Sequence, residues 1–306
     1  MASGRFLTIE SDEAGQRIDN YLLRRFKYLP RSHIYNLLRR GEIRINRRRT
    51  RPLYKLLAGD EVRLPPKMSD TVVPDAPVPD HLMGRLRQSV IFESQELLVV
   101  NKPAGVAVHG GSGLSFGVIE MLRKMRPEER FLELVHRLDR ETSGCLLIAK
   151  KRSTLRALHE LWRNGKVAKF YLALVEGDWQ GGRVDLALRK IERSGERIVI
   201  PDPQGKPSLS FFHRLKVGSG ATLMRVDIKT GRTHQIRVHA ASSGHPIVGD
   251  QKYGALSKGQ SAVKGLPPRL FLHAETLEFQ LPGEEQISRF CAPPSANFQR
   301  VIDALD

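Results

Sequence analysis

One carboxylate, Asp139, stands between Arg137 and Arg140 in the stretch HRLDRETSGCLLIAK, residues 136–150. An aspartate can act as a nucleophile or as a general base, and neighbouring arginines can bind phosphate groups. A surface ion pair that contributes about 0–1 kcal/mol would explain the same three residues. The stretch therefore offers a candidate catalytic acid, and the residues alone do not assign its reaction.

A second polar stretch, KTGRTHQIRVH, covers residues 229–239. Gly231 ends an alternating strand pattern, and we expect Thr233 to cap a helix that carries Gln235 and Arg237. Several hydrogen-bond donors at such a junction suit a phosphate or a carboxylate. A solvated polar turn fits the same composition equally well, because turns favour these residue types.

Metal and cofactor sites have no support in the motifs. The glycine-rich stretch at 110–117 matches neither GxGxxG nor the Walker A pattern, and it is typical of a flexible turn close to a substrate. The histidines of this region lack the spacing of a metal site, so we expect them to be core hydrogen-bonding groups or RNA contacts. They are His109, His136, His213, His234, His239 and His245. We predict no metal and no cofactor.

The composition indicates a polyanionic partner. The 306 residues carry a formal net charge of +17, which favours nucleic acid or an anionic membrane surface. No apolar run approaches the roughly 18–20 residues of a spanning helix, and the first ten residues lack the core of a signal peptide. Cys145 and Cys291 are too few and too distant for a disulfide framework. We therefore predict a cytoplasmic protein with a nucleic-acid partner and no membrane.

The elements that must position these residues fall into two parts. Residues 1–67 hold 16 Lys and Arg against seven Asp and Glu, a net charge of +9. There we expect two helices, RIDNYLLRRF and RSHIYNLLRRG, the second capped by Ser32 and ended by Gly41, and then two short strands, EIRIN and DEVRLP. The sequence predicts a basic domain over 1–68, a proline-rich linker over 69–85 and a larger domain over 86–306.

The larger domain shows a mixture of strand and helix patterns. Apolar strands are expected at 97–100, 145–149 and 170–175, and an alternating strand runs up to Ile228. A helix bracketed by Ser153 and Gly165 is expected between the second and third strands. Tyr171 lies inside the third strand, where a tyrosine is usually part of the core. From the residues alone, the protein is a two-part RNA-binding protein with a possible anionic site.

Four motifs together resemble those of the large-subunit ribosomal RNA pseudouridine synthases, and the match covers nearly the whole chain. The motifs are VVNKPAGVAVHGG (99–111), VHRLDRETSGCLLIAK (135–150), KFYLALVEG (169–177) and TGRTHQIRVHAASSGHPIVGD (230–250). Residues 15–66 resemble an S-four-type RNA-binding domain. The resemblance implies an α+β protein. In it, a small α/β RNA-binding domain precedes a catalytic domain with a largely antiparallel mixed β-sheet and a central cleft.

The resemblance also implies roles for individual residues. Asp139 would be the essential carboxylate, Tyr171 the tyrosine of the site and Arg237 the basic partner of the aspartate. Arg137 would enter the RNA where the target base leaves. The RNA-binding set implied or suggested by position is His136, Lys102, Arg232, Gln235, Arg39, Arg40, Arg47 and Arg48.

The implied activity is the site-specific isomerisation of uridine to pseudouridine in large-subunit (23S) ribosomal RNA, by a monomer that flips the target base. Two alternatives stay open at this point. One is a non-catalytic RNA-binding or ribosome-assembly protein, and the other is a pseudouridine synthase that acts on tRNA. The sequence names neither the uridines nor their number. It leaves open naked RNA or a ribosomal particle as substrate, and a nucleophilic or a glycal mechanism.

Overall fold

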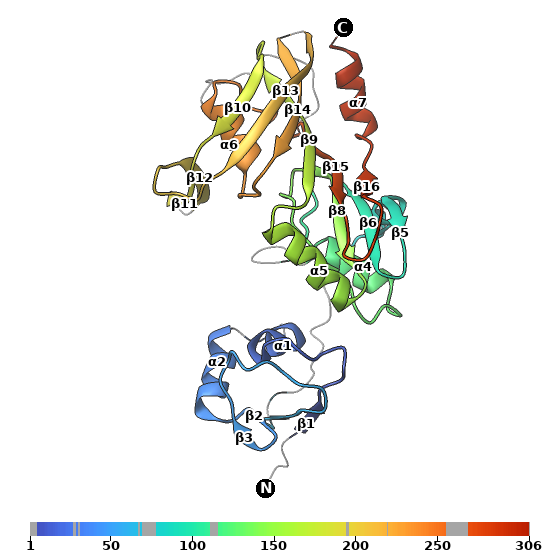
Figure 1. Cartoon of the computed structure of the whole chain (residues 1–306), viewed down its shortest axis with the longest axis vertical. Helices are drawn as coiled ribbons and strands as arrows, with labels where there is room; N and C mark the ends of the chain where they lie inside the picture. The colour runs from blue at the N-terminus through green and yellow to red at the C-terminus, as the bar shows by residue number, and fades with distance from the viewer. Residues whose placement is uncertain are drawn as a thin grey trace. The chain divides into compact units, whose positions relative to one another are not determined.

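The computed structural model describes residues 5–26, 29, 31–66, 68, 78–110, 116–193, 196–218, 220–254 and 269–305. The chain divides into two compact units, Met1–Ala76 and Pro77–Asp306, each described by itself below (Figure 1). Part of the predicted linker and most of the glycine-rich stretch lie outside the described residues. Residues 80–85, which the sequence assigned to the linker, form the start of α3 (Asp80–Gln88), where Leu86 is buried.

The first unit packs two helices against a small antiparallel sheet whose strand order is β1-β4-β2-β3. Its elements are β1 (Arg5–Thr8), α1 (Ile18–Arg25), α2 (Arg31–Arg40), β2 (Arg44–Ile45), β3 (Arg48–Arg49) and β4 (Glu61–Leu64). The apolar stripe of each helix is buried, as the sequence predicts, and Gly41 ends α2 with a φ of +72°. Ser32 lies inside α2, so its prediction as the cap is wrong.

Basic side chains gather at two exposed places of this unit. Arg39 and Arg40 end α2, while Arg47 and Arg48 lie at the turn between β2 and β3. Asn46 and Arg47 have φ values of 48° and 66°, which is the conformation of a two-residue type I′ hairpin turn. The turn therefore presents its arginines to solvent.

The second unit is built on one mixed sheet, with strand order β10-β13-β14-β9-β15-β8-β6-β5; β7 also pairs with β8 and β16 with β15. The strands are β5 (Val90–Glu93), β6 (Leu97–Lys102), β7 (Glu133–Leu134), β8 (Ser143–Ala149), β9 (Ala168–Glu176), β10 (Gly181–Asp185), β13 (Leu209–Gly218), β14 (Ala221–Ile228), β15 (Leu272–Phe279) and β16 (Ser288–Cys291). The helices are α3, α4 (Val118–Met125), α5 (Arg152–Arg163), α6 (Gln235–Ser242) and α7 (Ala296–Asp303). A separate hairpin, β11 (Leu188–Arg193) with β12 (Glu196–Pro201), projects from the main sheet (Figure 1).

The register of the central strands explains how distant motifs meet. Tyr171 on β9 lies opposite Val226 on β14 and opposite Ala274 on β15, both antiparallel. The pairing of β15 with β8 is parallel, which makes the sheet mixed, as predicted. Because β8 begins a few residues after Asp139, this register brings the stretch 136–150 close to Tyr171.

Continuous apolar sequence produces strands that are covered on both faces. Cys145 to Ala149 on β8 are all fully buried, and the strands expected around residues 97–100, 170–175 and up to Ile228 are confirmed as β6, β9 and β14. The helix expected after β8 is α5. It begins at Arg152 with Lys151 as the cap, so Ser153 lies inside it. Within the described part of the chain, no helix is long and apolar enough to cross a membrane.

Candidate active site

Six residues of the predicted site line one cavity of about 90 Å³ in the second unit. They are Arg137, Asp139, Tyr171, Arg232, Gln235 and Arg237. They come from the turn before β8, from β9, from the segment before α6 and from α6 itself. A second cavity of about 390 Å³ is also lined by Arg137, Asp139 and Arg237. The tertiary structure therefore gathers three separate motifs around the carboxylate of Asp139.

Asp139 keeps part of its side chain in solvent. Its side chain is 29% exposed, and Oδ2 lies 3.8 Å from Nη1 of Arg237 and 3.8 Å from Nε2 of His234. Both distances are longer than a hydrogen bond. The backbone around it forms a turn, in which the amide of Thr142 donates to the carbonyl of Asp139 at 3.2 Å. The carboxylate is thus faced by donors that do not occupy it.

Lys102 holds this turn from inside the protein. Its side chain is fully buried, and Nζ donates to the carbonyls of Pro103, Val106 and Arg140 at 2.9, 2.8 and 3.0 Å. Burial lowers its pKa to about 7. The prediction that Lys102 contacts RNA is wrong, because the ammonium group is enclosed by carbonyls of the protein. Lys102 instead positions Arg140, the residue that follows Asp139, through the carbonyl of Arg140.

Arg237 is fixed by an acid that the sequence analysis did not select. Its Nε and Nη2 donate to the two carboxylate oxygens of Asp250 at 2.7 and 2.8 Å, and its guanidinium lies 5.0 Å from the centre of the Tyr253 ring. Burial alone would raise the pKa of Asp250, but the hydrogen bonds and charge of Arg237 outweigh it and the pKa lies below its usual range. The cation is therefore held in one orientation beside Asp139.

His234 also faces Asp139 through a defined hydrogen-bond chain. Tyr253 Oη accepts from the amide of Val199 at 3.0 Å and lies 2.7 Å from Nδ1 of His234. The tautomer in which the phenol donates to Nδ1 carries the imidazole N–H at Nε2, on the side of Asp139. Burial lowers the pKa of His234 despite the opposing charge of Asp139. In that neutral tautomer, the imidazole faces the carboxylate with a hydrogen-bond donor.

The cap of α6 differs from the prediction. His234, with a φ of 55°, is the N-cap residue, so Thr233 does not cap the helix. A left-handed backbone is unfavourable for a residue other than glycine, and surrounding contacts must maintain it. The bond to Tyr253 is one such contact. The strained position aims the imidazole into the site.

Tyr171 forms the inner wall of the same cavity. Burial, with a smaller effect from Asp139, raises its pKa above the ordinary value of a phenol. A phenol with a raised pKa stays protonated at neutral pH. This chemistry suits stacking or hydrogen-bond donation more than proton removal.

Arg137 is exposed and points to neither acid suggested by its sequence neighbours. Glu133 pairs with Arg123 at 3.0 Å, and Glu141 pairs with Arg140 at 3.5 Å. Among the described residues, Arg137 has no hydrogen bond or ion pair of its own. Its guanidinium is therefore available at the rim shared by both cavities.

Two further residues of the predicted RNA-binding set are engaged inside the protein. His136 accepts from the amide of Leu147 at 3.1 Å and stacks on Trp162, and burial lowers its pKa to about 3. Gln235 uses all four hydrogen-bonding positions of its amide on protein groups, and it is 3% exposed. The prediction that Gln235 contacts RNA is wrong, because the fold satisfies its whole amide. His136 is half-buried, and its contact with RNA stays a prediction.

Sequence reasoning missed Asp250 and Tyr253 and gave no specific role to His234. Asp250 lies at the end of the motif 230–250, and Tyr253 follows it by three residues. One signal could have found them. A buried guanidinium requires a partner, and an acid and a tyrosine follow closely after the helix that carries Arg237. The spacing alone did not reveal that the chain turns back onto α6.

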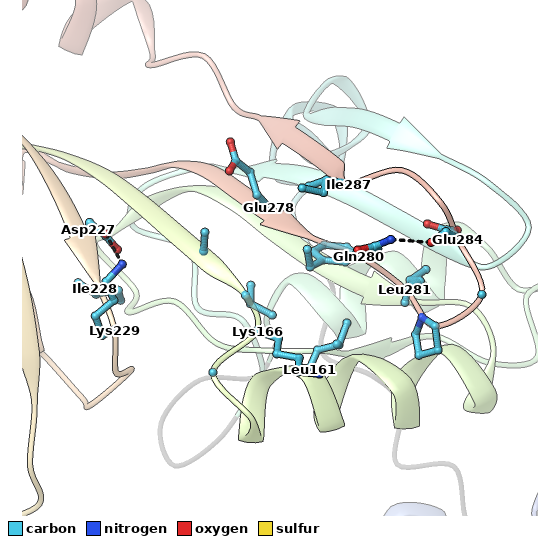
Figure 2. Close-up of a pocket in the computed structure, with 16 residues that line it drawn as sticks. Leu161, Lys166, Asp227, Ile228, Lys229, Glu278, Gln280, Leu281, Glu284 and Ile287 are labelled. Atoms are coloured by element: carbon cyan, nitrogen blue, oxygen red, sulfur yellow. Dashed lines mark hydrogen bonds and ion pairs between the residues drawn. The ribbon is translucent and has the colours of Figure 1, made fainter.

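A larger cavity lies elsewhere in the second unit. It measures about 670 Å³ beside the end of α5, and Figure 2 shows Asp227, Ile228 and Lys229 on one side of it. Its charged lining residues are two lysines and three acids, and Lys229 pairs with Asp227. This balance gives no attraction for a polyanion. We assign the active site to the smaller cavities around Asp139, where the donors converge.

The described residues contain no group of three or more His, Cys, Asp or Glu side chains that could hold a metal ion. Instead, the histidines of the region bond to protein groups. His239 lies 2.8 Å from Ser208, and His245 lies 2.8 Å from the carbonyl of Glu176. These two match the prediction of core hydrogen-bonding histidines.

Comparisons with known proteins place both units in known domain families. A family model for RNA pseudouridylate synthases matches residues 96–242, and one for the S4 domain matches residues 16–62. Human RNA Pseudouridylate Synthase Domain Containing 1 has a related structure, with a TM-score of 0.57 and 27% identity over 75% of this chain and 97% of that one. Both units therefore correspond to the S4 and synthase domains that the sequence motifs indicated.

The chain belongs to the RNA pseudouridylate synthase family and is accordingly an isomerase. Relatives named Ribosomal large subunit pseudouridine synthase C cover nearly the whole chain. The protein from Pasteurella multocida (strain Pm70) is 51% identical over 98% of this chain and 94% of its own length, and the one from Escherichia coli (strain K12) is 50% identical over 99% and 97%. The family recognised from the motifs is thus confirmed.

Proposed function

We propose that this enzyme converts uridine to pseudouridine in large-subunit ribosomal RNA, with Asp139 as the essential carboxylate. The observation that carries the proposal is the carboxylate of Asp139, which accepts no hydrogen bond from the described residues and faces Arg237 and His234 at 3.8 Å in a cavity. The names of the relatives that match nearly the whole chain support ribosomal RNA as the substrate. The high positive charge of the chain agrees with an RNA partner.

The reaction needs no group from outside the RNA. The bond between the uracil nitrogen N1 and C1′ of the ribose breaks, the uracil turns, and a bond forms between C5 and C1′. C5 then loses its proton, and N1 gains one. A carboxylate can begin the sequence by attacking C1′ or by taking the proton from C2′, which gives a glycal. Both routes use one ionised acid, and Asp139 is the acid that lies in the cavity.

The neighbouring groups complete the site without chemistry of their own. Arg237 orients the carboxylate from a position set by Asp250, and it supplies positive charge as the uracil leaves. Tyr171 stays protonated and packs against the base as it turns. The imidazole of His234 is the second group that faces the carboxylate of Asp139.

Arg137 is the residue we assign to base flipping. A uridine stacked in folded RNA cannot reach Asp139, so it must leave the stack at a cost of a few kcal/mol. Arg137 is two residues from the acid, exposed, and without a carboxylate partner among the described residues. Its planar guanidinium can fill the vacated place and bond to neighbouring bases or phosphates.

The first unit supplies general affinity for RNA in this proposal. Arg39, Arg40, Arg47 and Arg48 are exposed there, and phosphate contacts of this kind dominate affinity at low salt. We further propose that the enzyme works as a monomer in the cytoplasm. A synthase that acts on tRNA is the remaining alternative, and the names of the relatives favour ribosomal RNA.

The decisive experiment compares the wild-type chain with Asp139→Asn on large-subunit ribosomal RNA and on tRNA, both from a strain that lacks the enzyme. We expect wild type to restore pseudouridines in ribosomal RNA alone, mapped by reverse transcription after chemical labelling. Asn keeps the shape of the side chain but removes the charge, so turnover should vanish while RNA affinity changes less than about 2-fold. Activity of Asp139→Asn above a few per cent of wild type would refute the assignment.

A further inference from the structure

We propose that a cavity beside the active site binds a second nucleotide, one that neighbours the target uridine in the same RNA strand. The cavity has a volume of about 420 Å³ and lies between the β11–β12 hairpin, the loop at 204–206 and the turn before α6. This inference rests on the proposed function, because it assigns a place to RNA next to the reacting base.

The two cavities are contiguous. Gly231 and Arg232 line both the catalytic cavity and this second one. A Cβ atom added at Gly231 would meet nothing within 4 Å, so the space at the boundary is open. An RNA strand whose target base lies against Asp139 therefore carries an adjoining nucleotide past Gly231 toward the hairpin.

The charge of the second cavity suits a phosphate. Its lining residues include four cations and no acid, and the cations are Arg189, Lys190, Lys206 and Arg232. Arg189 pairs with Asp202 at 2.6 Å. Among the described residues, Lys190 and Lys206 pair with no carboxylate, and both are exposed. Two uncompensated ammonium groups at one cavity form a site for an anionic phosphate.

The floor of the cavity suits a base. Leu188 and Val199 line it, are each 4% exposed, and pack with Val238 of α6 and with Tyr253. Leu188 exchanges backbone hydrogen bonds of 2.9 and 2.8 Å with Lys206. This bridge brings an ammonium group and an apolar floor together before any ligand arrives. A pocket with an apolar floor and a charged rim matches the two ends of a nucleotide.

The other large cavity shows that such a lining is not general. The cavity of about 670 Å³ in Figure 2 carries two lysines against three acids. The catalytic cavity and the second one are the places where unpaired cations adjoin the path of the strand. The proposal therefore selects the β11–β12 cavity by charge rather than by size.

The test uses the full chain and a stem-loop of large-subunit ribosomal RNA that wild type converts. The variant Lys190→Gln with Lys206→Gln removes both ammonium groups, and Arg197→Gln is the matched control, since Arg197 is exposed on β12 but does not line the cavity. For the double variant we expect KM to rise about 10-fold with kcat unchanged. The slope of log Kd against the logarithm of the salt concentration should become smaller by about 0.7 for each lost phosphate contact. The control should differ from wild type by less than about 2-fold.

A second arm probes the base. Abasic nucleotides placed singly on each side of the target uridine remove one base while they keep every phosphate. Loss of the base that occupies the cavity should weaken wild-type binding by roughly 5-fold or more. The proposal is wrong if neither abasic position weakens binding, or if the double variant behaves like Arg197→Gln. Pseudouridine formation by wild type in the same reactions tests the proposed function separately, so the two failures are distinguishable.

Discussion

The two sides of the active site are built in opposite ways. On one side, Asp139 lies on a turn, is partly exposed, and has both donor neighbours at 3.8 Å. On the other side, Arg237 lies on a buried helix and makes two hydrogen bonds of 2.7 and 2.8 Å to Asp250. Two nitrogens of the cation are bonded to Asp250, whereas the carboxylate of Asp139 accepts no hydrogen bond from the described residues.

This difference explains how Asp139 can be held near a fixed positive charge and still be free to react with the substrate. If Arg237 had no partner of its own, it would pair directly with Asp139 and occupy the oxygen that must react. Asp250 prevents this by holding the guanidinium in place. Fixed charges that need no rearrangement during the reaction are the efficient form of electrostatic catalysis.

The largest expected effect comes from Asp250→Asn, which breaks the fixed side. The substitution leaves Arg237 buried without a charged partner, a change that costs about 3 kcal/mol of folding free energy. The freed guanidinium should move onto Asp139. We expect kcat to fall about 100-fold while KM changes little, measured by single-turnover pseudouridine formation below the unfolding transition.

Tyr253→Phe is the control for this change. It keeps the ring beside Arg237 but removes the hydroxyl that bonds to His234 and Val199. Its loss in kcat should stay near 10-fold. If Asp250→Asn turned over as fast as Tyr253→Phe, the anchoring of Arg237 would not be what keeps Asp139 available.

The next largest loss of turnover is expected for Arg137→Met, on the exposed side of the site that holds Asp139. The variant keeps a long side chain but loses the guanidinium. On a structured stem-loop we expect turnover to fall about 10- to 50-fold, because base extrusion costs a few kcal/mol without the arginine. On a single strand with an unstacked target uridine, the loss should be about 2-fold. Equal losses on both RNAs would assign Arg137 to chemistry or folding rather than to flipping.

The smallest effect on the site is expected for Lys102→Met, and it is an effect on stability. The substitution removes the hydrogen bonds that hold the turn of Asp139 from inside the protein. Three carbonyls lose their donor, at a cost of about 1–3 kcal/mol. This stability contribution depends on pH, since burial lowers the pKa of Lys102 to about 7 in the folded protein from its ordinary value of 10.5. Between these values the unfolded chain binds more protons, so wild-type stability gains from this group as pH rises.

Urea unfolding of both proteins from pH 6 to pH 10 checks this sign. The difference in unfolding free energy between wild type and Lys102→Met should increase from about pH 7 upward. A free-energy difference that does not change with pH would contradict the prediction. It would mean that Lys102 stays protonated in the folded protein, because its carbonyl partners raise its pKa more than burial lowers it.

Sequence periodicity predicted the elements that carry the site, but it placed helix starts poorly. The apolar runs became β6, β8, β9 and β14, because continuous hydrophobic residues must be covered on both faces. Ser32 and Thr233 were wrong as caps, and Ser153, which was expected to bracket its helix, lies one residue inside it. A cap depends on the backbone angle of the preceding turn, which composition does not specify.

By itself, the sequence determined the family, the basic charge and the three residues that face one another in the cavity, Asp139, Tyr171 and Arg237. Those features are local motifs or sums over the chain. Only the tertiary structure decided that Lys102 and Gln235 serve the fold, because their polar atoms meet partners from distant segments. It also brought Asp250 and Tyr253 to Arg237. Which donor reaches which acceptor depends on how the strands pair and the helices pack, and no spacing along the chain contains that information.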